Sequence, residues 1–319
     1  MIYSPDLEQH VAEARAFNEQ LAQFPPLSIV TLEEIRQARE LIESPESPFA
    51  GTPPVLPVLE REVPGAAGPI AARVLRPERV EGVYLDIHGG AWMIGSPRMD
   101  DAENDELARS VDLATLSIDY RMAPEHRLED AMDDCEAAAL WLIEHAREEF
   151  GTDRLVIGGG SAGAHLAAMT LLRLRDRHQA AGRFLGANLV FGCYDLSGTP
   201  SARKGQSAVL GKGTFEGVAK HVHRGRTGDQ LRDPAISPLF ADLSGLPPAL
   251  LTVGTLDPLL DDSLFMATRW EAAGNEAELA VYPESDHAFT AFPTTMARVA
   301  HEREQAWLRE RLGATAGVA

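Results

Sequence analysis

Apolar residues recur at helical spacing in the first part of the chain. Over residues 7–17 they follow one another at intervals of three or four, which predicts an amphipathic helix. A second helix is expected to begin after Thr31, because Thr31 with Glu34 three residues later matches a capping box. A stretch rich in Ser, Pro and Gly then ends the helical region. We therefore expect residues 1–50 to form an N-terminal helical cap segment and residues 51–319 to form a second, larger domain.

From about residue 55 the pattern changes to short apolar runs, which predict eight strands. From the fourth strand onward these runs alternate with helical segments, so we expect crossover connections and a mostly parallel sheet flanked by helices, an α/β fold. Short turns join the first strands, which should form an antiparallel edge. The expected strands are 55–63, 70–76, 82–89, 113–120, 154–160, 187–195, 248–254 and 277–283, and the expected helices that follow are 129–149, 162–175, 261–273 and 294–311.

The connection between the sixth and seventh strands is unusually long. Residues 197–243 are rich in Gly and weakly periodic, with one helical stretch near residues 214–223. A segment of this length at the carboxyl edge of a sheet often covers a site. We expect a cap or lid insertion at about residues 198–240, joined by the two N-terminal helices.

The charge of the chain argues against nucleic-acid and membrane-surface partners. The formal net charge is −19 at pH 7, and no run of Lys and Arg reverses it locally. The first residues lack a basic region followed by an apolar run, and no stretch of about 18 apolar residues occurs. We expect a cytoplasmic protein that acts on a small molecule, and the sequence leaves open whether it forms a homodimer.

Few residues suit metal binding or disulfide formation. Cys135 and Cys193 are too isolated for a zinc site or a disulfide framework, so we expect two free thiols. His221 and His223 lack a third ligand nearby and are more typical of a solvated helix face. No metal site is predicted.

The glycine-rich segment 154–165 fits two motifs with different chemistry. G-x-G-x-x-G would bind a dinucleotide, and G-x-S-x-G would expose a nucleophilic serine. The dinucleotide interpretation needs an acidic residue about 20 residues further on, at the end of the next strand. Asp176 lies in a predicted helix and Asp195 comes too late. The nucleophile interpretation, with Ser161 between Gly159 and Gly163, is therefore favoured.

The nucleophile interpretation makes further demands that distant loops meet. An oxyanion needs backbone N–H donors from the residue after the serine and from a Gly-rich loop after an earlier strand. Ala162 and the loop with Gly89 and Gly90 provide them. A histidine must take the serine proton and a carboxylate must orient it. His287 and Asp257 follow the last two strands; the rival acids, each a weaker candidate, are Asp261, Asp262, Glu284 and Asp286.

These motifs together resemble the hormone-sensitive-lipase-like branch of the α/β-hydrolase fold. The resemblance implies a triad of Ser161, Asp257 and His287, oxyanion donors at Gly89, Gly90 and Ala162, and a cap over an acyl pocket. It also implies a serine carboxylic-ester hydrolase acting on short to medium acyl esters through an acyl-enzyme, without metal or organic cofactor. The motifs are "HGGAW", "DYRMAPEHRLEDAMDD", "GGGSAGAHLAA", "SPLFADLSGLPPALLTVGTLDPLLDD" and "DHAF".

Two positions depart from the pattern of that family. The third glycine of H-G-G-G is Ala91, which adopts positive φ less readily, and an acid usual before the serine is replaced by Gly160. We expect Trp92 and Gly160 to border the substrate pocket, and His88 to hold the oxyanion loop. "HGGAW" also resembles kynurenine formamidases, so an amidase, formamidase or lactonase with the same triad is the alternative. The same fold includes ligand receptors in which the triad histidine is replaced. His287 is present here, which argues against a binding protein without catalysis.

Overall fold

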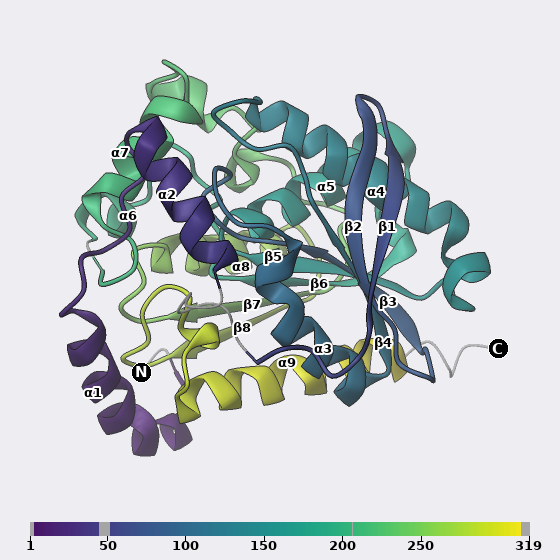
Figure 1. The fold of residues 1–319 in the computed structure, drawn as a ribbon, viewed down its shortest axis with the longest axis horizontal. Coiled ribbons are helices and arrows are strands. Elements are labelled where there is room, and N and C mark those ends of the chain that lie inside the picture. The colour runs from purple at the N-terminus through teal and green to yellow at the C-terminus, as the bar shows by residue number, and fades with distance from the viewer. Residues whose placement is uncertain (1–2, 45–51, 206, 314–319) are drawn as a thin grey trace.

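A central sheet of eight strands organises the computed structural model, which describes residues 3–44, 52–205 and 207–313 (Figure 1). The strand order is β1-β2-β4-β3-β5-β6-β7-β8. All eight predicted strands are therefore confirmed. Their bounds are Val58–Gly65 (β1), Gly68–Leu75 (β2), Gly82–Ile87 (β3), Leu113–Ile118 (β4), Leu155–Gly160 (β5), Phe184–Val190 (β6), Ala249–Gly254 (β7) and Ala277–Tyr282 (β8).

The sheet is parallel except at one edge. Strand β2 pairs antiparallel with both β1 and β4, and every other pairing is parallel. Every residue of β3, β4 and β7 is buried, because parallel strands joined by crossover helices are covered on both faces. This explains why their sequences are continuous apolar runs. The carboxyl ends of β3, β5, β7 and β8 meet at one edge, where the predicted site residues lie.

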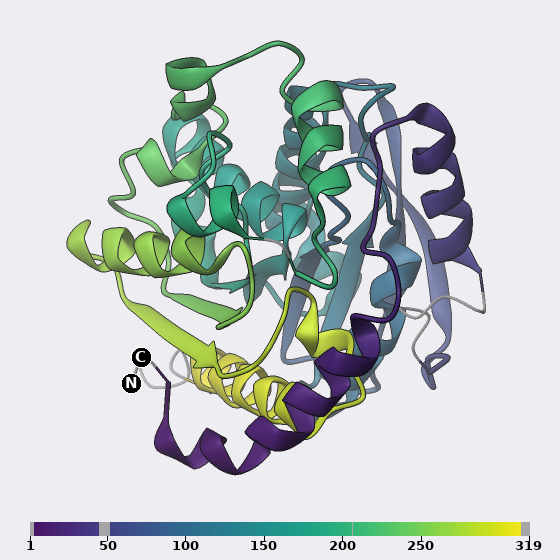
Figure 2. The same cartoon turned by 90° about the vertical axis from the view of Figure 1, so that its left-hand side faces the viewer.

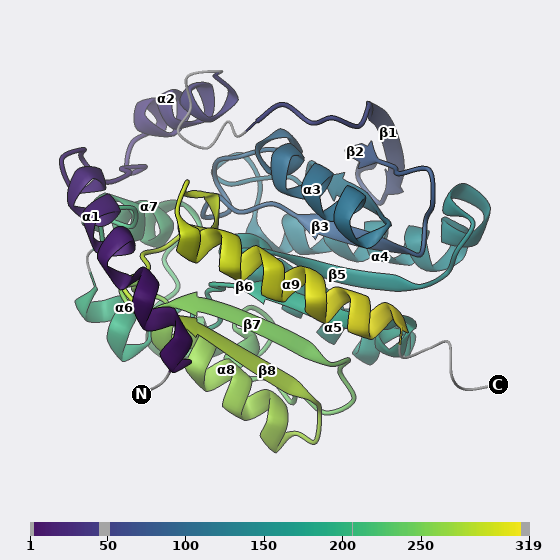
Figure 3. The same ribbon diagram turned by 90° about the horizontal axis from the view of Figure 1, so that it is seen from below.

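Helices cover both faces of the sheet (Figure 3). Helices α3 and α9 lie together on one face, where Arg309 donates to the Ser110 carbonyl oxygen, and α4, α5 and α8 lie on the other. The bounds are Val11–Leu21 (α1), Leu32–Glu43 (α2), Asp101–Val111 (α3), Leu128–Phe150 (α4), Ala162–His178 (α5), Pro200–Lys204 (α6), Lys212–His221 (α7), Leu260–Ala272 (α8) and Thr295–Gly313 (α9).

The sequence pattern missed α3, which lies between β3 and β4. Leu107 and Val111 of this helix are buried, but so are the polar residues Asp101, Asn104 and Asp105. Because polar side chains occupy part of the inward face, the apolar periodicity is interrupted. The end of β6 also differs: the strand stops at Val190, and the expected strand residues up to 195 form a loop.

The N-terminal helices lie on the same side of the molecule as the insertion after β6 (Figure 2). Helix α2 begins with the predicted capping box of Thr31 and Glu34. The segment before it pairs with the insertion: Leu27 forms a β-bridge with Leu210, and the Thr214 hydroxyl donates to the Leu27 carbonyl oxygen at 2.8 Å. The described parts of the two segments thus contact each other. The boundary expected near residue 50 falls on residues 45–51, outside the described residues, and stays a prediction.

Candidate active site

Ser161 stands in a tight turn between β5 and α5. Its backbone has φ 56° and ψ −116°, a combination that few residues adopt without surrounding constraint. The glycines on either side bring that constraint. A Cβ on Gly159 would lie 2.0 Å from the Ile87 carbonyl oxygen, and one on Gly163 would lie 1.8 Å from the same atom. Only glycine permits this approach of the turn to β3, so Ser161 projects at the carboxyl edge of the sheet.

Gly163→Ala is expected to lower the free energy of unfolding by about 1–3 kcal/mol or more, because its methyl group would overlap the backbone of β3. Gly182→Ala is the matched control: a Cβ there meets nothing within 4 Å, and we expect a change within about 0.5 kcal/mol. Chemical denaturation of both variants measures the difference. Equal stability of the two would contradict the close contact.

The side chains of Ser161, His287 and Asp257 form one chain of hydrogen bonds. The Ser161 Oγ and His287 Nε2 atoms are 2.9 Å apart, and His287 Nδ1 is 2.9 Å from Asp257 Oδ2. The Asp257 carboxylate is fully buried and also accepts the Leu259 N–H at 2.7 Å. Asp257 follows β7 and His287 follows β8, so neighbouring parallel strands deliver both residues beside Ser161. This geometry suits a hydroxyl whose proton passes to an oriented imidazole.

The rival carboxylates have other partners. Asp262 accepts the N–H groups of Tyr194 and Asp195 and the Thr199 hydroxyl, and burial raises the pKa of Asp262 to about 7. Asp261 accepts the Ser201 N–H. Asp286 accepts the backbone N–H of His287, while Glu284 pairs with Arg15. Among all the candidate acids, Asp257 is the one whose side chain contacts the His287 ring.

Hydrogen bonds to two backbone carbonyl oxygens hold the loop after β3, so its N–H groups point the other way. The Tyr120 hydroxyl donates to the His88 carbonyl oxygen at 2.9 Å, and His88 Nδ1 donates to the Gly89 carbonyl oxygen at 2.7 Å. Because C=O and N–H point in opposite directions across a trans peptide, the N–H groups of Gly89 and Gly90 face away from these partners. Neither donates to a backbone oxygen of a described residue. Ala162 begins α5, so its N–H lacks a partner within the helix.

His88 and Ala91 hold this loop in shape. Burial lowers the pKa of His88 to about 4, so the ring stays neutral near pH 7 and keeps its Nδ1 proton for Gly89. Ala91 has φ 53° and Trp92 has φ 59°, both in the left-handed region. The position that the family usually gives to glycine thus keeps a glycine-like conformation, at a local cost of about 1 kcal/mol.

Trp92 lies in the interior. Its side chain is 3% exposed and does not line the cavity beside Ser161, and its indole N–H donates to His165 Nδ1 at 3.2 Å. His165 Nε2 in turn donates to the Ile236 carbonyl oxygen at 2.8 Å, so Trp92 connects the loop after β3 to the insertion through His165. Ala91, the residue before Trp92, lines the cavity in its place, and Gly160 lines it too.

Comparison with known proteins places this geometry in a family. The family model described as alpha/beta hydrolase fold matches residues 84–291. The chain belongs to this family. It is 35% identical to carboxylic ester hydrolase LipN of Mycobacterium tuberculosis over 73% of this chain and 64% of LipN, so it spans somewhat less than two thirds of that relative. It is 32% identical to an arylesterase of Saccharolobus solfataricus over 68% of this chain and 71% of that protein.

A solved structure agrees along almost the whole chain. The hyperthermophilic esterase from the archaeon Pyrobaculum calidifontis superposes with a TM-score of 0.83 at 29% identity, covering 97% of this chain and 99% of that one. The resemblance found in the sequence motifs is thereby confirmed. In this α/β-hydrolase the glycine-rich turn holds Ser161 beside His287, which favours the nucleophile interpretation of the turn over the dinucleotide one.

Phe191 is a site residue that the sequence did not reveal. Its ring lies against Gly160, where a Cβ would come 3.1 Å from the ring, and it packs on His287 with ring centroids 4.8 Å apart. The aromatic ring thus occupies the space beside Gly160 and supports the imidazole. Phe191 sits just after β6 with φ 37°. The sequence did not indicate this role, because residues 187–195 were expected to form one continuous strand.

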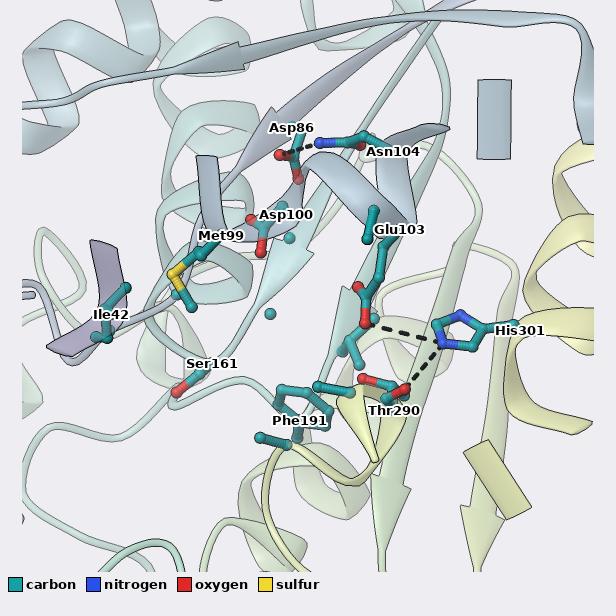
Figure 4. A pocket seen from close by; sticks show the side chains of 18 of the residues that line it. Ile42, Asp86, Met99, Asp100, Glu103, Asn104, Ser161, Phe191, Thr290 and His301 are labelled. Carbon is teal, nitrogen blue, oxygen red and sulfur yellow. Dashed lines mark hydrogen bonds and ion pairs between the residues drawn. The ribbon is translucent and has the colours of Figure 1, made fainter. Parts of the chain in front are cut away.

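A cavity of about 590 Å³ begins at Ser161 and His287. Near Ser161 its wall is apolar, formed by α2 and the insertion through Ala38, Ile42 and Leu210. Further in, polar residues of α3 and α9 line it (Figure 4). In the described part of the chain, no three His, Cys, Asp or Glu side chains are placed to hold a metal ion. No helix among the described residues is long and apolar enough to cross a bilayer.

Proposed function

We propose that this α/β-hydrolase is a serine carboxylic-ester hydrolase that works through an acyl-enzyme. The observation that carries the proposal is the unbroken chain of hydrogen bonds from Ser161 through His287 to Asp257. The esterases among its relatives support the same activity. The experiment that tests it is hydrolysis of p-nitrophenyl butyrate by the wild type and by Ser161→Ala, which is treated below.

The first half of the reaction forms the acyl-enzyme. His287 Nε2 takes the hydroxyl proton as Ser161 Oγ attacks the ester carbonyl carbon. The carbonyl oxygen becomes an oxyanion, and the N–H groups of Gly89, Gly90 and Ala162 donate hydrogen bonds to it. Asp257 accepts a hydrogen bond from His287 Nδ1–H throughout, which keeps the correct tautomer and stabilises the imidazolium.

Collapse of this first intermediate completes the acyl-enzyme, and water then releases the acid. The imidazolium of His287 gives its Nε2 proton to the leaving alkoxide as the carbonyl re-forms, and the alcohol departs. Water then takes the place of the alcohol: His287 removes one of its protons while the oxygen attacks the acyl carbon. Collapse of this second intermediate breaks the bond to Ser161 Oγ, which recovers its proton from His287.

Short and medium acyl chains are the proposed substrates. A cavity of about 590 Å³ suits a small or medium ligand, and part of it has a polar lining that an alkyl chain would not cover favourably. In a series of p-nitrophenyl acetate, butyrate, octanoate and palmitate we therefore expect the highest kcat/KM at or below octanoate. A maximum at palmitate would contradict the proposed range.

Amides and lactones use the same catalytic groups, so the panel also includes N-formylkynurenine and a γ-lactone. We expect the esters to react faster, because the relatives described above are esterases. A kcat/KM for N-formylkynurenine above that of every ester would replace esterase with formamidase while leaving the triad in place.

A further inference from the structure

The inner part of the cavity is a polar lobe rich in carboxylates. We call it the acidic lobe and define it by Asp86 of β3, Asp100 and Glu103 at the start of α3, Asn188 of β6 and Glu304 of α9, all of which line the cavity. Figure 4 shows Asp100 and Glu103 facing the same hollow as Ser161. The lobe is thus continuous with the space that holds the reacting ester.

The carboxylates at the base of the lobe are held in place. Asp86 is 5% exposed and accepts hydrogen bonds from Asn104 Nδ2 at 2.8 Å and from the Ser117 hydroxyl at 2.6 Å. Asp100 shares a hydrogen bond with Asp86. Glu103 is less enclosed, since 44% of its side-chain surface is exposed. Fixed acceptors on β3 and α3 therefore point at one region of space.

Asn188 adds an independent observation. Its side chain is 1% exposed, and its Nδ2 donates to the Tyr84 hydroxyl and to Glu304 Oε1. Its Oδ1 is buried and has no hydrogen-bond partner among the described residues. Leaving a buried acceptor unsatisfied costs about 1–3 kcal/mol. The wall of the lobe at Asn188 is thus polar and carries no positive charge.

The positive charges along the cavity do not balance the carboxylates. Of the described lining residues, Arg109 is bound by Asp105, and His301 lies 3.4 Å from Glu304 and 3.8 Å from Glu103. Burial alone would lower the pKa of His301, but these two glutamates raise it to about 10, so its single charge is already shared. Burial, followed by the neighbouring carboxylates, raises the pKa of Asp100. The lobe is short of cations.

We propose that the acidic lobe binds the primary ammonium group of a cationic ester substrate. An ammonium carries three N–H donors and no acceptor, which matches a lobe whose lining consists largely of carboxylates. Bringing this cation out of water is costly, and the negative charges of Glu103 and of the hydrogen-bonded Asp86–Asp100 pair offset that cost. The inference rests on the proposed function, since it names the substrate class of the same Ser161-centred site.

Matched pairs of esters test the preference. p-Nitrophenyl 8-aminooctanoate is compared with p-nitrophenyl nonanoate, and 6-aminohexyl butyrate with heptyl butyrate, so that an ammonium replaces a methyl group on the acyl side or on the alcohol side. In at least one pair we expect kcat/KM to be about tenfold or more higher for the ammonium ester, the value of one or more charge-assisted hydrogen bonds. Ratios at or below one in both pairs would overturn the proposal.

Two isosteric variants locate the effect. Glu103→Gln removes one charge and Asp100→Asn replaces one acceptor oxygen by an N–H donor, and we expect each to reduce the ratio between the ammonium ester and its neutral partner about tenfold. Asp229→Asn is the matched control, because it removes one charge from a side chain that is 99% exposed and outside the cavity. A ratio that both lobe variants preserve, or that Asp229→Asn reduces equally, would overturn the proposal.

The salt dependence distinguishes binding in the acidic lobe from long-range attraction of the cation to a chain of net charge −19. At about 1 M NaCl the Debye length falls to about 3 Å, so surface attraction is screened while a buried pair is not. We expect the wild-type ratio to persist, and its fall to one would assign the preference to the surface. Ser161→Ala is run beside these assays. Hydrolysis that survives it would defeat the proposed function, whereas Ser161-dependent hydrolysis without ammonium preference would defeat the acidic lobe alone.

Discussion

Ser161→Ala is expected to lower kcat for p-nitrophenyl butyrate by about 10⁴-fold or more. The alanine lacks the oxygen that forms the acyl-enzyme, and the remaining hydrolysis would come from binding and from the oxyanion donors alone. The structure should stay intact, because the strained turn depends on Gly159 and Gly163 rather than on the hydroxyl. Steady-state rates under saturating ester, with the unfolding temperature measured in parallel, give the comparison.

Ser110→Ala is the matched control for this loss. Ser110 lies in α3 outside the cavity, and its backbone oxygen, not its hydroxyl, accepts the bond from Arg309. Its kcat should stay within about twofold of the wild type. Treatment with diethyl p-nitrophenyl phosphate should add one diethylphosphoryl group to the wild type and to Ser110→Ala and none to Ser161→Ala. Near wild-type turnover by Ser161→Ala would remove this serine from the mechanism.

Asp257→Asn should be the next most damaging change, with a loss of about 10³–10⁴-fold in kcat. The buried carboxylate accepts the proton of His287 Nδ1, whereas an amide in its place can present an N–H and stabilise the other tautomer. His287 Nε2 would then carry a proton and could not accept the one from Ser161. Rates measured at neutral pH with short-chain esters report this loss.

Asp261→Asn provides the comparison for that variant. Asp261 lies in the first turn of α8, four residues after Asp257, and accepts the Ser201 N–H but not a hydrogen bond from His287. We expect its kcat to stay within a few-fold of the wild type. Equal losses in Asp257→Asn and Asp261→Asn would show that general disturbance of this loop, and not orientation of His287, limits the rate.

The eight strands and the loops that carry Ser161, Asp257 and His287 could be predicted from the sequence. Buried parallel strands appear as continuous apolar runs, and a turn that needs Gly159 and Gly163 leaves a short, specific pattern. These signals are local, so they survive without knowledge of distant contacts. They also indicated which loops should meet, because carboxyl ends of parallel strands share one edge of a sheet.

Features that depend on packing against distant segments were not predictable. The polar inward face of α3 hid the helix, because Asp101 is buried against Arg73 of β2, a contact that no local pattern reveals. From the sequence, Trp92 could equally line a pocket or pack in the interior. The structure shows it in the interior, with its indole N–H bonded to His165. The position of Phe191 beside His287 depends on the end of β6 at Val190, one residue earlier.

By itself the sequence determined the α/β class of this protein, its eight strands and the residues of the proposed triad, because those depend on periodicity and on short turns. The tertiary structure alone decided how the loop after β3 is held and where the acidic lobe lies. Asp100 directly precedes α3, Asn188 lies in β6 and Glu304 in α9, and their closeness is a product of how the helices cover the sheet. Charge gathered in this way from separate elements leaves no pattern along the chain.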